Sequence, residues 1–281
     1  MSETLLNIEN VKKSFKDVHA VNNVDLKIVK GQNISLVGES GSGKSTLARL
    51  IMKLYLSDQG SMTFDDHDLA QLRGKQLKDV YRHVQMVFQD PYSSLDPRFN
   101  VRRILSEALT LLNPNERREV NVEALMKELL EAVNLSSDIL MRYPHEFSGG
   151  ERQRIAIARA LMVKPKLLIL DEAVSSLDVL IQAQIINLLF DLQKKYDLTY
   201  FFISHNLKVV QKLSHQVAVM YKGKIVEYAS TQMIFENPQH AYTKQLLAAA
   251  LDYKPVELSE DLNLSDTSQL KDLGGGHFVR V

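Results

Sequence analysis

One short segment constrains the fold of this chain more than any other. Residues 38–46 read Gly-Glu-Ser-Gly-Ser-Gly-Lys-Ser-Thr and fit the pattern G-x-x-x-x-G-K-[ST]. The apolar run Ile34–Val37 before this segment predicts a buried strand, and Thr46–Leu56 after it predicts an amphipathic helix. The N–H groups of such a loop and the positive end of the helix dipole converge on one anion. The segment therefore predicts a phosphate-binding loop in an α/β fold.

The residue types in this loop indicate separate roles for its members. Gly38, Gly41 and Gly43 let the backbone curl so that successive N–H groups point inward. Lys44 can reach the β and γ phosphates of a nucleotide, and the Ser45 hydroxyl can hold Mg²⁺. The alternative interpretation is an ordinary Gly/Ser turn, and the flanking strand and helix argue against it.

A second glycine-containing helix start lies further along the chain. Ser148-Gly149-Gly150 precedes an apolar helical pattern that continues to Val163. Ser148 is a typical N-cap residue, and the glycines leave N–H groups open at the helix N-terminus. By itself this pattern is typical of a plain capped helix. Together with the first loop it predicts a second phosphate half-site, which need not face the first one within a single chain.

Two adjacent carboxylates follow a fully apolar strand. Residues 167–170 lead to Asp171 and Glu172, and Pro165 precedes the strand. Because open α/β sheets bind ligands at the carboxyl ends of their strands, Asp171 is a candidate Mg²⁺ ligand and Glu172 could orient an attacking water. Neighbouring residues on a strand point to opposite faces, which would allow the two acids different roles. The alternative is an Asp-Glu pair that only begins a turn.

Polar residues also follow two other apolar strands. The predicted strand Val84–Phe88 ends at Gln89, a candidate ligand or sensor, and residues 200–204 form a predicted strand that ends at His205. The other seven histidines have no metal-ligand spacing, so His205 is singled out by its position alone.

In this order and spacing, these features resemble the motifs of the ATPase subunits of ABC transporters. The features are the loop at 38–46, Gln89, the Ser-Gly-Gly helix start, Asp171-Glu172, Asp178 and His205. The resemblance covers nearly the whole chain. It implies an α/β fold in which a P-loop NTPase core carries an antiparallel β subdomain and a helical insert. It also implies ATP and Mg²⁺ as cofactors.

The same resemblance implies a role for each matching residue. Glu172 would be the general base, His205 would contact the γ-phosphate, and Gln89 would couple the metal site to the membrane partner. Phe15 would stack on adenine, and the Ser148 helix start would close over ATP bound to the other ATPase subunit. The implied Mg²⁺ ligands are Ser45, Gln89 and Asp171. The implied nucleotide-binding residues are Phe15, Gly38, Ser40, Gly41, Gly43, Lys44, Ser45, Thr46, Ser148, Gly149, Gly150 and Asp178.

The sequence departs from the family pattern in two places. Glu151 stands where the most familiar pattern has Gln, and Ala173-Val174 replaces a frequent Pro-Thr pair after the catalytic acid. Neither change replaces a residue that is expected to bind phosphate. Glu151 would add a negative charge near the composite site.

Composition and charge narrow the function classes. The chain has 281 residues, with 34 basic and 34 acidic side chains, so no charge imbalance points to nucleic acid. The chain has no cysteine, which excludes disulfides and thiolate metal sites. The N-terminus lacks the pattern of a signal peptide, and no apolar run approaches the roughly 20 residues that span a bilayer. These features favour a soluble cytoplasmic enzyme, for which any transport role needs separate membrane subunits.

The pattern along the chain predicts one ATPase domain over residues 1–250 and a tail over 251–281. The domain core covers 1–89 and 164–228, and a helical subdomain covers 90–163. Predicted strands and helices occupy Leu5–Phe15, Val18–Ile28, Val101–Leu112, Val122–Asn134, Ser148–Val163, Val179–Tyr196 and Leu207–Leu213, with Asn113-Pro114-Asn115 as a break and a hairpin around Lys222-Gly223. The polar, acid-rich tail is expected to be mostly extended or weakly docked.

Four segments resemble the oligopeptide and dipeptide importer ATPases within the superfamily. They are residues 38–42, 88–98, 143–147 and 237–243, the last reading Asn-Pro-Gln-His-Ala-Tyr-Thr with Ala241 where that subgroup usually has Pro. This likeness implies an ATP-hydrolysing subunit, at the cytoplasmic face of the inner or plasma membrane, that powers uptake of short peptides. The implied partners are a second, non-identical ATPase subunit, two transmembrane permeases and an extracytoplasmic substrate-binding protein.

Three alternative functions are associated with the same motifs. Nickel and metallophore importers share much of the pattern and are the nearest alternative for the cargo. Soluble ABC ATPases of DNA repair, chromosome structure or translation carry long coiled coils, zinc cysteines or fused ATPase domains, and the sequence has none of these. A module that senses ATP without hydrolysis is the third alternative, and the presence of Glu172 and His205 argues against it.

Overall fold

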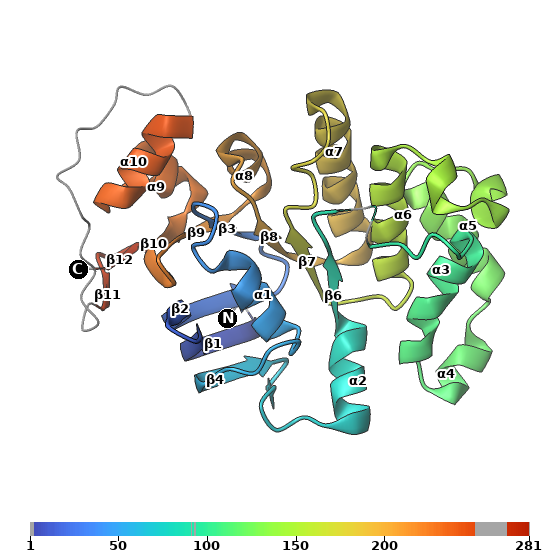
Figure 1. Ribbon diagram of the computed structural model, residues 1–281, viewed down its shortest axis with the longest axis horizontal. Coiled ribbons are helices and arrows are strands. Elements are labelled where there is room, and N and C mark those ends of the chain that lie inside the picture. Colours follow the sequence, from blue (N-terminus) through green and yellow to red (C-terminus); the bar gives the residue numbers. More distant parts are fainter. Residues whose placement is uncertain (1–2, 91, 93, 251–268, 281) are drawn as a thin grey trace. The chain divides into compact units, whose positions relative to one another are not determined.

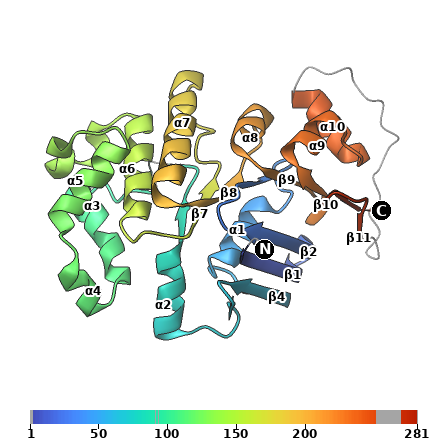
Figure 2. The same ribbon diagram turned by 180° about the vertical axis from the view of Figure 1, so that it is seen from behind.

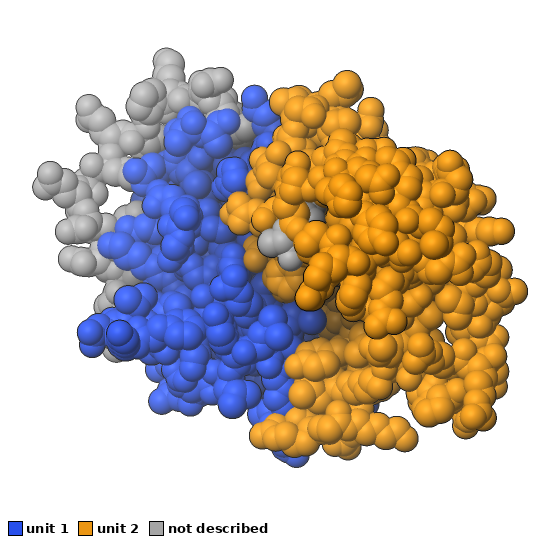
Figure 3. Space-filling model, turned by 45° about the vertical axis from the view of Figure 1, so that its right-hand side comes forward, with its two compact units in different colours: residues 1–71, 200–281 blue, residues 72–199 orange. Residues whose placement is uncertain are grey.

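The computed structural model describes residues 3–90, 92, 94–250 and 269–280. The chain forms two compact units, shown in different colours in Figure 3. Unit 1 combines residues 1–71 with residues 200–281, and unit 2 consists of residues 72–199.

An antiparallel sheet in unit 1 contains the N-terminal strands (Figure 1). Its strand order is β2 (Val18–Val29), β1 (Thr4–Phe15), β4 (Gln59–Phe64) and β5 (His67–Asp68). Alternate side chains such as Leu6 and Ile8 are buried, as expected for a strand with one face on a core. The predicted antiparallel β subdomain is therefore confirmed.

A second sheet in unit 1 carries the phosphate-binding loop. Its strands in this unit follow the order β11 (Leu270–Asp272), β12 (Phe278–Arg280), β10 (Lys224–Ser230), β9 (Gln216–Tyr221), β3 (Ile34–Val37) and β8 (Thr199–Ile203). Strand β3 runs parallel to both β8 and β9, and every residue of β3 and β8 is buried. The bounds predicted for β3 are confirmed. The carboxyl ends of β3 and β8 lie at one edge of the sheet, so the loop after β3 and His205 after β8 emerge on the same side.

The helices of unit 1 are short. They are α1 (Lys44–Ile51), α8 (Leu207–Leu213), α9 (Thr231–Glu236) and α10 (Ala241–Ala250). Helix α1 begins and ends earlier than the predicted range 46–56, and the left-handed backbone at Lys53 (φ 52°) stops any continuation. The predicted helix over 207–213 and the hairpin at Lys222-Gly223 are confirmed. Both turn residues have positive φ, which a tight two-residue hairpin turn requires.

Unit 2 packs helices around a parallel strand pair, seen from two sides in Figures 1 and 2. The strands are β6 (Val84–Val87) and β7 (Leu167–Asp171). Helix α6 packs against α3, α5 and α7 and is buried along most of its length. The helices are α2 (Gly74–His83), α3 (Val101–Ala108), α4 (Pro114–Glu119), α5 (Val122–Ala132), α6 (Gly149–Leu161) and α7 (Val179–Tyr196), with single 3₁₀ turns at Leu109–Leu111, Ser137–Met141 and Pro144–Glu146.

Two expectations about local structure need correction. The predicted break at 113–115 is present only at Leu112 and Asn113, because Asn113 and Glu116 form a reciprocal capping box and Pro114 is already the first residue of helix α4. Residues 270–280 are not weakly docked: β12 pairs with both β10 and β11, and His277, Val279 and Arg280 are buried. Residues 251–268 of the expected tail lie outside the described residues.

Within the described ranges, no helix combines the length and the apolar character that crossing a membrane requires.

Candidate functional site

The phosphate-binding loop requires glycine at two positions for steric reasons. Gly38 has φ 151° and Gly43 has φ 108°, a backbone conformation that other residues rarely adopt. A Cβ atom on Gly38 would lie 2.1 Å from the Met220 carbonyl oxygen, and one on Gly43 would lie 2.0 Å from the Ala20 carbonyl oxygen. Gly41 also has positive φ (80°), but a Cβ there would meet nothing within 4 Å. The loop can therefore follow this path only because Gly38 and Gly43 have no side chain where the loop approaches neighbouring backbone.

Lys44 lies inside the curve of this loop. It is the first residue of α1, and its side chain is 5 % exposed. The Nζ atom donates hydrogen bonds to the carbonyl oxygens of Gly38 (2.9 Å) and Glu39 (2.7 Å) and to Ser42 Oγ (3.3 Å). Ser45 and Thr46 follow in the first turn of the helix and are partly exposed. A buried ammonium group therefore lies within the loop at the start of a helix, and this combination suits a polyphosphate.

Two contacts from the C-terminal part of unit 1 support the loop, and sequence analysis found neither. The Gly223 N–H donates to the Ser42 carbonyl oxygen at 2.9 Å, and the Glu39 N–H donates to Tyr242 Oη at 3.0 Å. Tyr242 is 1 % exposed, and burial raises the pKa of its phenol to about 12. The segment containing Tyr242 resembled a subgroup motif, but that resemblance carried no role for the residue.

The remaining predicted residues of unit 1 are accessible. Phe15 ends β1 with 40 % exposure, and its ring makes an edge contact with Tyr55 at 5.2 Å between centroids. Lys13 Nζ lies 5.4 Å from the centre of the Phe15 ring. His205 is exposed just after β8. An exposed aromatic face beside a cation is compatible with stacking on a base, as predicted for Phe15.

The two acids in unit 2 lie at the end of β7, but in different backbone settings. Asp171 is the last residue of the strand and is 6 % exposed, whereas Glu172 lies beyond the strand in a left-handed conformation (φ 48°). The expectation that both acids point to opposite faces of one strand was therefore wrong, because the strand ends between them. The left-handed backbone at Glu172 costs roughly 1–2 kcal/mol for a non-glycine residue.

Gln89 contacts Glu172 directly. Gln89 follows β6, and its Nε2 donates a hydrogen bond to Glu172 Oε2 at 2.9 Å. Strands β6 and β7 are parallel neighbours, so the residues after them meet at one sheet edge. The structure thus brings together two of the three predicted catalytic residues in one hydrogen bond.

The Ser148 helix start is a complete capping box. The Glu151 N–H donates to Ser148 Oγ (3.3 Å), while the Ser148 N–H and hydroxyl donate to Glu151 Oε2 (2.9 and 2.8 Å). These bonds, the backbone one foremost, hold the pKa of Glu151 below its usual range. Gly149 and Gly150 form the first turn of α6, and a Cβ on Gly150 would lie 2.6 Å from Ile181 Cγ2. Glu151, the departure from the common Gln, therefore serves as a cap.

Asp178 caps the helix that packs on these glycines. Its Oδ1 accepts hydrogen bonds from the N–H groups of Leu180 (3.1 Å) and Ile181 (3.0 Å) at the start of α7. Because Ile181 touches Gly150, the Asp178 turn and the Ser148 helix start lie side by side in unit 2.

The predicted Mg²⁺ ligands are divided between the units: Ser45 belongs to unit 1, and Gln89 and Asp171 belong to unit 2. In the part of the chain that the structure describes, no cluster of three or more His, Cys, Asp or Glu side chains could hold a metal ion. Pro91 and Ser93, within the segment 88–98 that resembles the peptide importer ATPases, lie outside the described residues.

Comparison with known proteins identifies related sequences over most of the chain. A family model described as ABC transporter matches residues 21–175. The oligopeptide transport ATP-binding protein OppF of Streptococcus mutans is 41% identical over 98% of this chain and 94% of its own length. The glutathione import ATP-binding protein GsiA of Pectobacterium atrosepticum is 50% identical over 83% of this chain, which spans only 37% of that protein.

Solved structures share the fold. The cbiO1 protein of Clostridium perfringens, part of the transporter complex cbiONQ, has a TM-score of 0.74 and 25% identity and matches 84% of this chain and 92% of its own. The ATP-binding cassette MJ0796, solved as a dimer with ADP and Pi, has a TM-score of 0.69 and 27% identity and matches 81% of this chain and 99% of its own. The family model covers more than half of the 281 residues, and the phosphate-binding loop, the capped Ser-Gly-Gly helix and the strand-end acid are all present. The chain belongs to the ABC transporter family, and its fold is that of the ATP-binding cassette.

Proposed function

We propose that this chain is the ATP-hydrolysing subunit of a membrane importer that takes up short peptides. The hydrogen bond between Gln89 Nε2 and Glu172 Oε2 is the observation that carries the hydrolysis proposal, because it orients a carboxylate at the carboxyl end of a parallel strand. The 41% identity to an oligopeptide transport protein over nearly the full length of both chains supports the peptide cargo. Glutathione, named for the other relative, is also a short peptide.

The side chains of this protein fit ATP and Mg²⁺. Lys44, enclosed by its loop, would bind the phosphates together with the N–H groups of the first turn of α1. The oxygen atoms of Ser45, Gln89 and Asp171 are of the type that Mg²⁺ prefers. When bound, Mg²⁺ supplies positive charge that stabilises the charge developing on the transferred phosphoryl group. Phe15 would stack on adenine.

Each remaining site residue has a separate role in ATP hydrolysis or binding. Glu172 accepts a proton from the attacking water, Gln89 keeps the Glu172 carboxylate oriented, and His205 donates to the γ-phosphate. Ser148, Gly149 and Gly150 bind ATP held by a second ATPase subunit, next to the turn that Asp178 caps. Two half-sites on one chain therefore call for a dimer.

We further propose the assembly in which this chain works. It comprises a second, related ATPase subunit, two permeases and an extracytoplasmic substrate-binding protein, with this chain at the cytoplasmic face of the inner or plasma membrane. In this proposal residues 1–250 form the ATPase domain, with 90–163 as its helical subdomain, and 251–281 form a tail. Affinity purification of the native complex from membranes tests the assembly, and recovery of this chain without permeases would refute it.

Replacement of Glu172 by Gln tests the mechanism. The amide keeps the shape of the side chain but cannot accept the proton, so ATP turnover by the purified complex should fall by about 10²–10⁴-fold while ATP binding persists. Glu123→Gln, which neutralises a surface carboxylate paired with Arg102, is the matched control and should leave turnover unchanged. Turnover of Glu172→Gln within a few-fold of the parent would remove Glu172 from the role of base.

Uptake assays test the cargo. In cells that lack this subunit, uptake of di- and oligopeptides should be lost, and a plasmid copy should restore it. Loss of nickel or chelated-metal uptake with peptide uptake unchanged would assign the chain to a metal importer and leave the ATPase proposal intact.

A further inference from the structure

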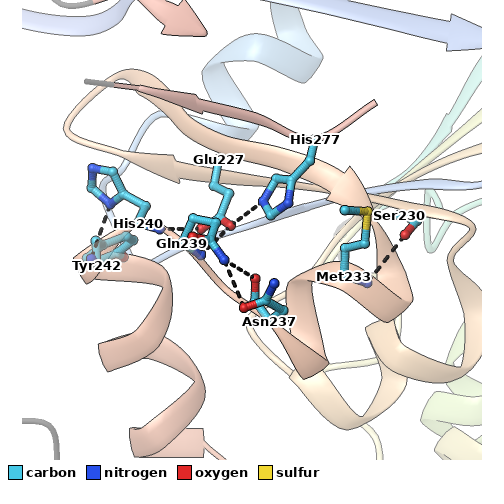
Figure 4. A network of polar contacts seen from close by, with 8 residues as sticks. All are labelled: Glu227, Ser230, Met233, Asn237, Gln239, His240, Tyr242 and His277. Atoms are coloured by element: carbon cyan, nitrogen blue, oxygen red, sulfur yellow. Dashed lines mark hydrogen bonds and ion pairs between the residues drawn. The ribbon is translucent and has the colours of Figure 1, made fainter. Parts of the chain in front are cut away.

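A buried polar cluster in unit 1 connects the C-terminal strand to the start of α10 (Figure 4). At its centre, the Glu227 side chain on β10 is fully buried. Its Oε1 accepts hydrogen bonds from the Gln239 N–H (2.8 Å) and from His277 Nε2 (2.7 Å), and its Oε2 accepts one from the His240 N–H (2.9 Å). A buried carboxylate is costly unless such donors surround it, so this arrangement fixes the positions of its partners.

The cluster determines where α10 begins. The N–H groups before and within the first turn of a helix have no carbonyl partner in that helix, and the Glu227 carboxylate on β10 accepts hydrogen bonds from two of those that precede α10, Gln239 and His240. His240 Nδ1 in turn accepts a hydrogen bond from the Tyr242 N–H at 3.1 Å. Burial lowers the pKa of His240, which favours the neutral ring that this acceptor role requires. The backbone of Tyr242 is therefore held through His240 by Glu227.

Tyr242 links this cluster to the phosphate-binding loop. Its ring lies 4.3 Å from the ring of Tyr221, centre to centre, and its Oη accepts the Glu39 N–H at 3.0 Å. Tyr221 ends the strand before the turn whose Gly223 N–H bonds the Ser42 carbonyl oxygen. The loop is thus attached to the C-terminal part of the unit at Glu39 and at Ser42.

We propose that Tyr242 is a positioning residue for the phosphate-binding loop, and that Glu227 and His277 hold it in place. The inference rests on the proposed function, since it concerns how tightly the loop binds the phosphates of ATP. With the Glu39 N–H bound to Tyr242, the first turn of the loop is fixed, and the N–H groups from Gly41 onward keep the direction that an anion needs. His277 lies just before β12, so the C-terminal hairpin, formed by β11 and β12, would influence ATP affinity without touching the nucleotide.

Removal of the Tyr242 hydroxyl tests the first step. Tyr242→Phe keeps the ring against Tyr221 and loses only the acceptor for the Glu39 N–H. In the full-length chain, the Kd values for ATP and for inorganic tripolyphosphate should both rise about fivefold, the effect of one hydrogen bond of about 1 kcal/mol. Tyr228→Phe is the matched control, because its ring lies against Phe278, and both Kd values should stay at the parental level.

The tripolyphosphate probe separates a positioning role from a purely structural one. A lower melting temperature of Tyr242→Phe with unchanged tripolyphosphate affinity would make the residue structural and overturn the inference. If the parent chain bound neither ATP nor tripolyphosphate, the proposed function itself would fail. If the parent bound both and Tyr242→Phe bound them equally well, only the present inference would fail.

A double-mutant cycle tests the second step. His277→Ala should raise the Kd for tripolyphosphate about two- to threefold in the parent and should add nothing in the Tyr242→Phe background, because both changes act through the same contact. His277→Gln can still donate to Glu227 and should restore the parental affinity. Additive effects of the two substitutions, or failure of His277→Gln to restore affinity, would disconnect the C-terminal hairpin from the loop.

Discussion

Gly43 is the position at which the loop path can be tested most directly. Its φ is 108°, and a Cβ atom would lie 2.0 Å from the Ala20 carbonyl oxygen, 2.8 Å from Met220 Cε and 3.2 Å from the Ala20 carbonyl carbon. The Met220 side chain can rotate away, but the Ala20 carbonyl belongs to strand β2, which pairs along its length with β1. Gly43→Ala must therefore displace the loop itself.

The expected loss of stability follows from two contributions. A positive φ costs an L-residue about 1–2 kcal/mol, and overpacking costs about 1–3 kcal/mol more. The free energy of unfolding should therefore fall by about 2–5 kcal/mol, a large part of the roughly 5–15 kcal/mol typical of folded proteins. Gly41→Ala is the matched control in the same loop, because it has φ 80° and open space around its Cβ, so only the backbone contribution of about 1–2 kcal/mol applies.

Urea unfolding of the three proteins measures these differences. The midpoint should fall most for Gly43→Ala, with an unchanged dependence on denaturant concentration. ATP affinity should fall in parallel, because a displaced loop no longer directs its N–H groups at one anion. Equal losses for Gly41→Ala and Gly43→Ala would show that the contact with Ala20 is not what requires glycine, and would refute the reasoning.

Two further predictions concern the Ser148 helix start. Gly150→Ala should lower the free energy of unfolding by about 1–3 kcal/mol, because its Cβ would lie 2.6 Å from Ile181 Cγ2. Ile181→Ala removes that atom, so urea unfolding of the double variant should show a smaller loss of stability than the sum of the two single losses. A loss equal to that sum would contradict this prediction. Because the pKa of Glu151 is held below its ordinary 4.5 by hydrogen bonds from Ser148, its contribution to stability is present above that value and is lost as the pH falls through the lowered folded-state pKa. Glu151→Gln should therefore flatten the pH dependence of the unfolding free energy below about pH 5, and identical acid profiles for both proteins would rule out this role.

Local patterns predicted most of the secondary structure that carries the site. The bounds of β3, α7 and α8 agree with the sequence prediction residue for residue, because each is a clean apolar pattern with a clear start and stop. The predicted break at 113–115 is shorter in the structure, because Asn113-Pro114 also forms a helix start and Glu116 completes the capping box of α4. The sequence analysis did not identify α2, α9 or α10, of which α9 is only six residues long.

The sequence alone determined the local chemistry of this protein: the glycine-rich loop with Lys44, the Ser148 cap and the acids after an apolar strand. Each depends on residues within one or two turns of each other, and such short-range geometry follows from residue type and spacing. Only the tertiary structure decided which distant groups meet. Glu172 leaves its strand to meet Gln89, 83 residues away, and the Glu39 N–H meets Tyr242, 203 residues away. No periodicity or motif encodes those contacts, because they arise when parallel strands align their carboxyl ends and when a buried carboxylate, Glu227, fixes the start of a helix.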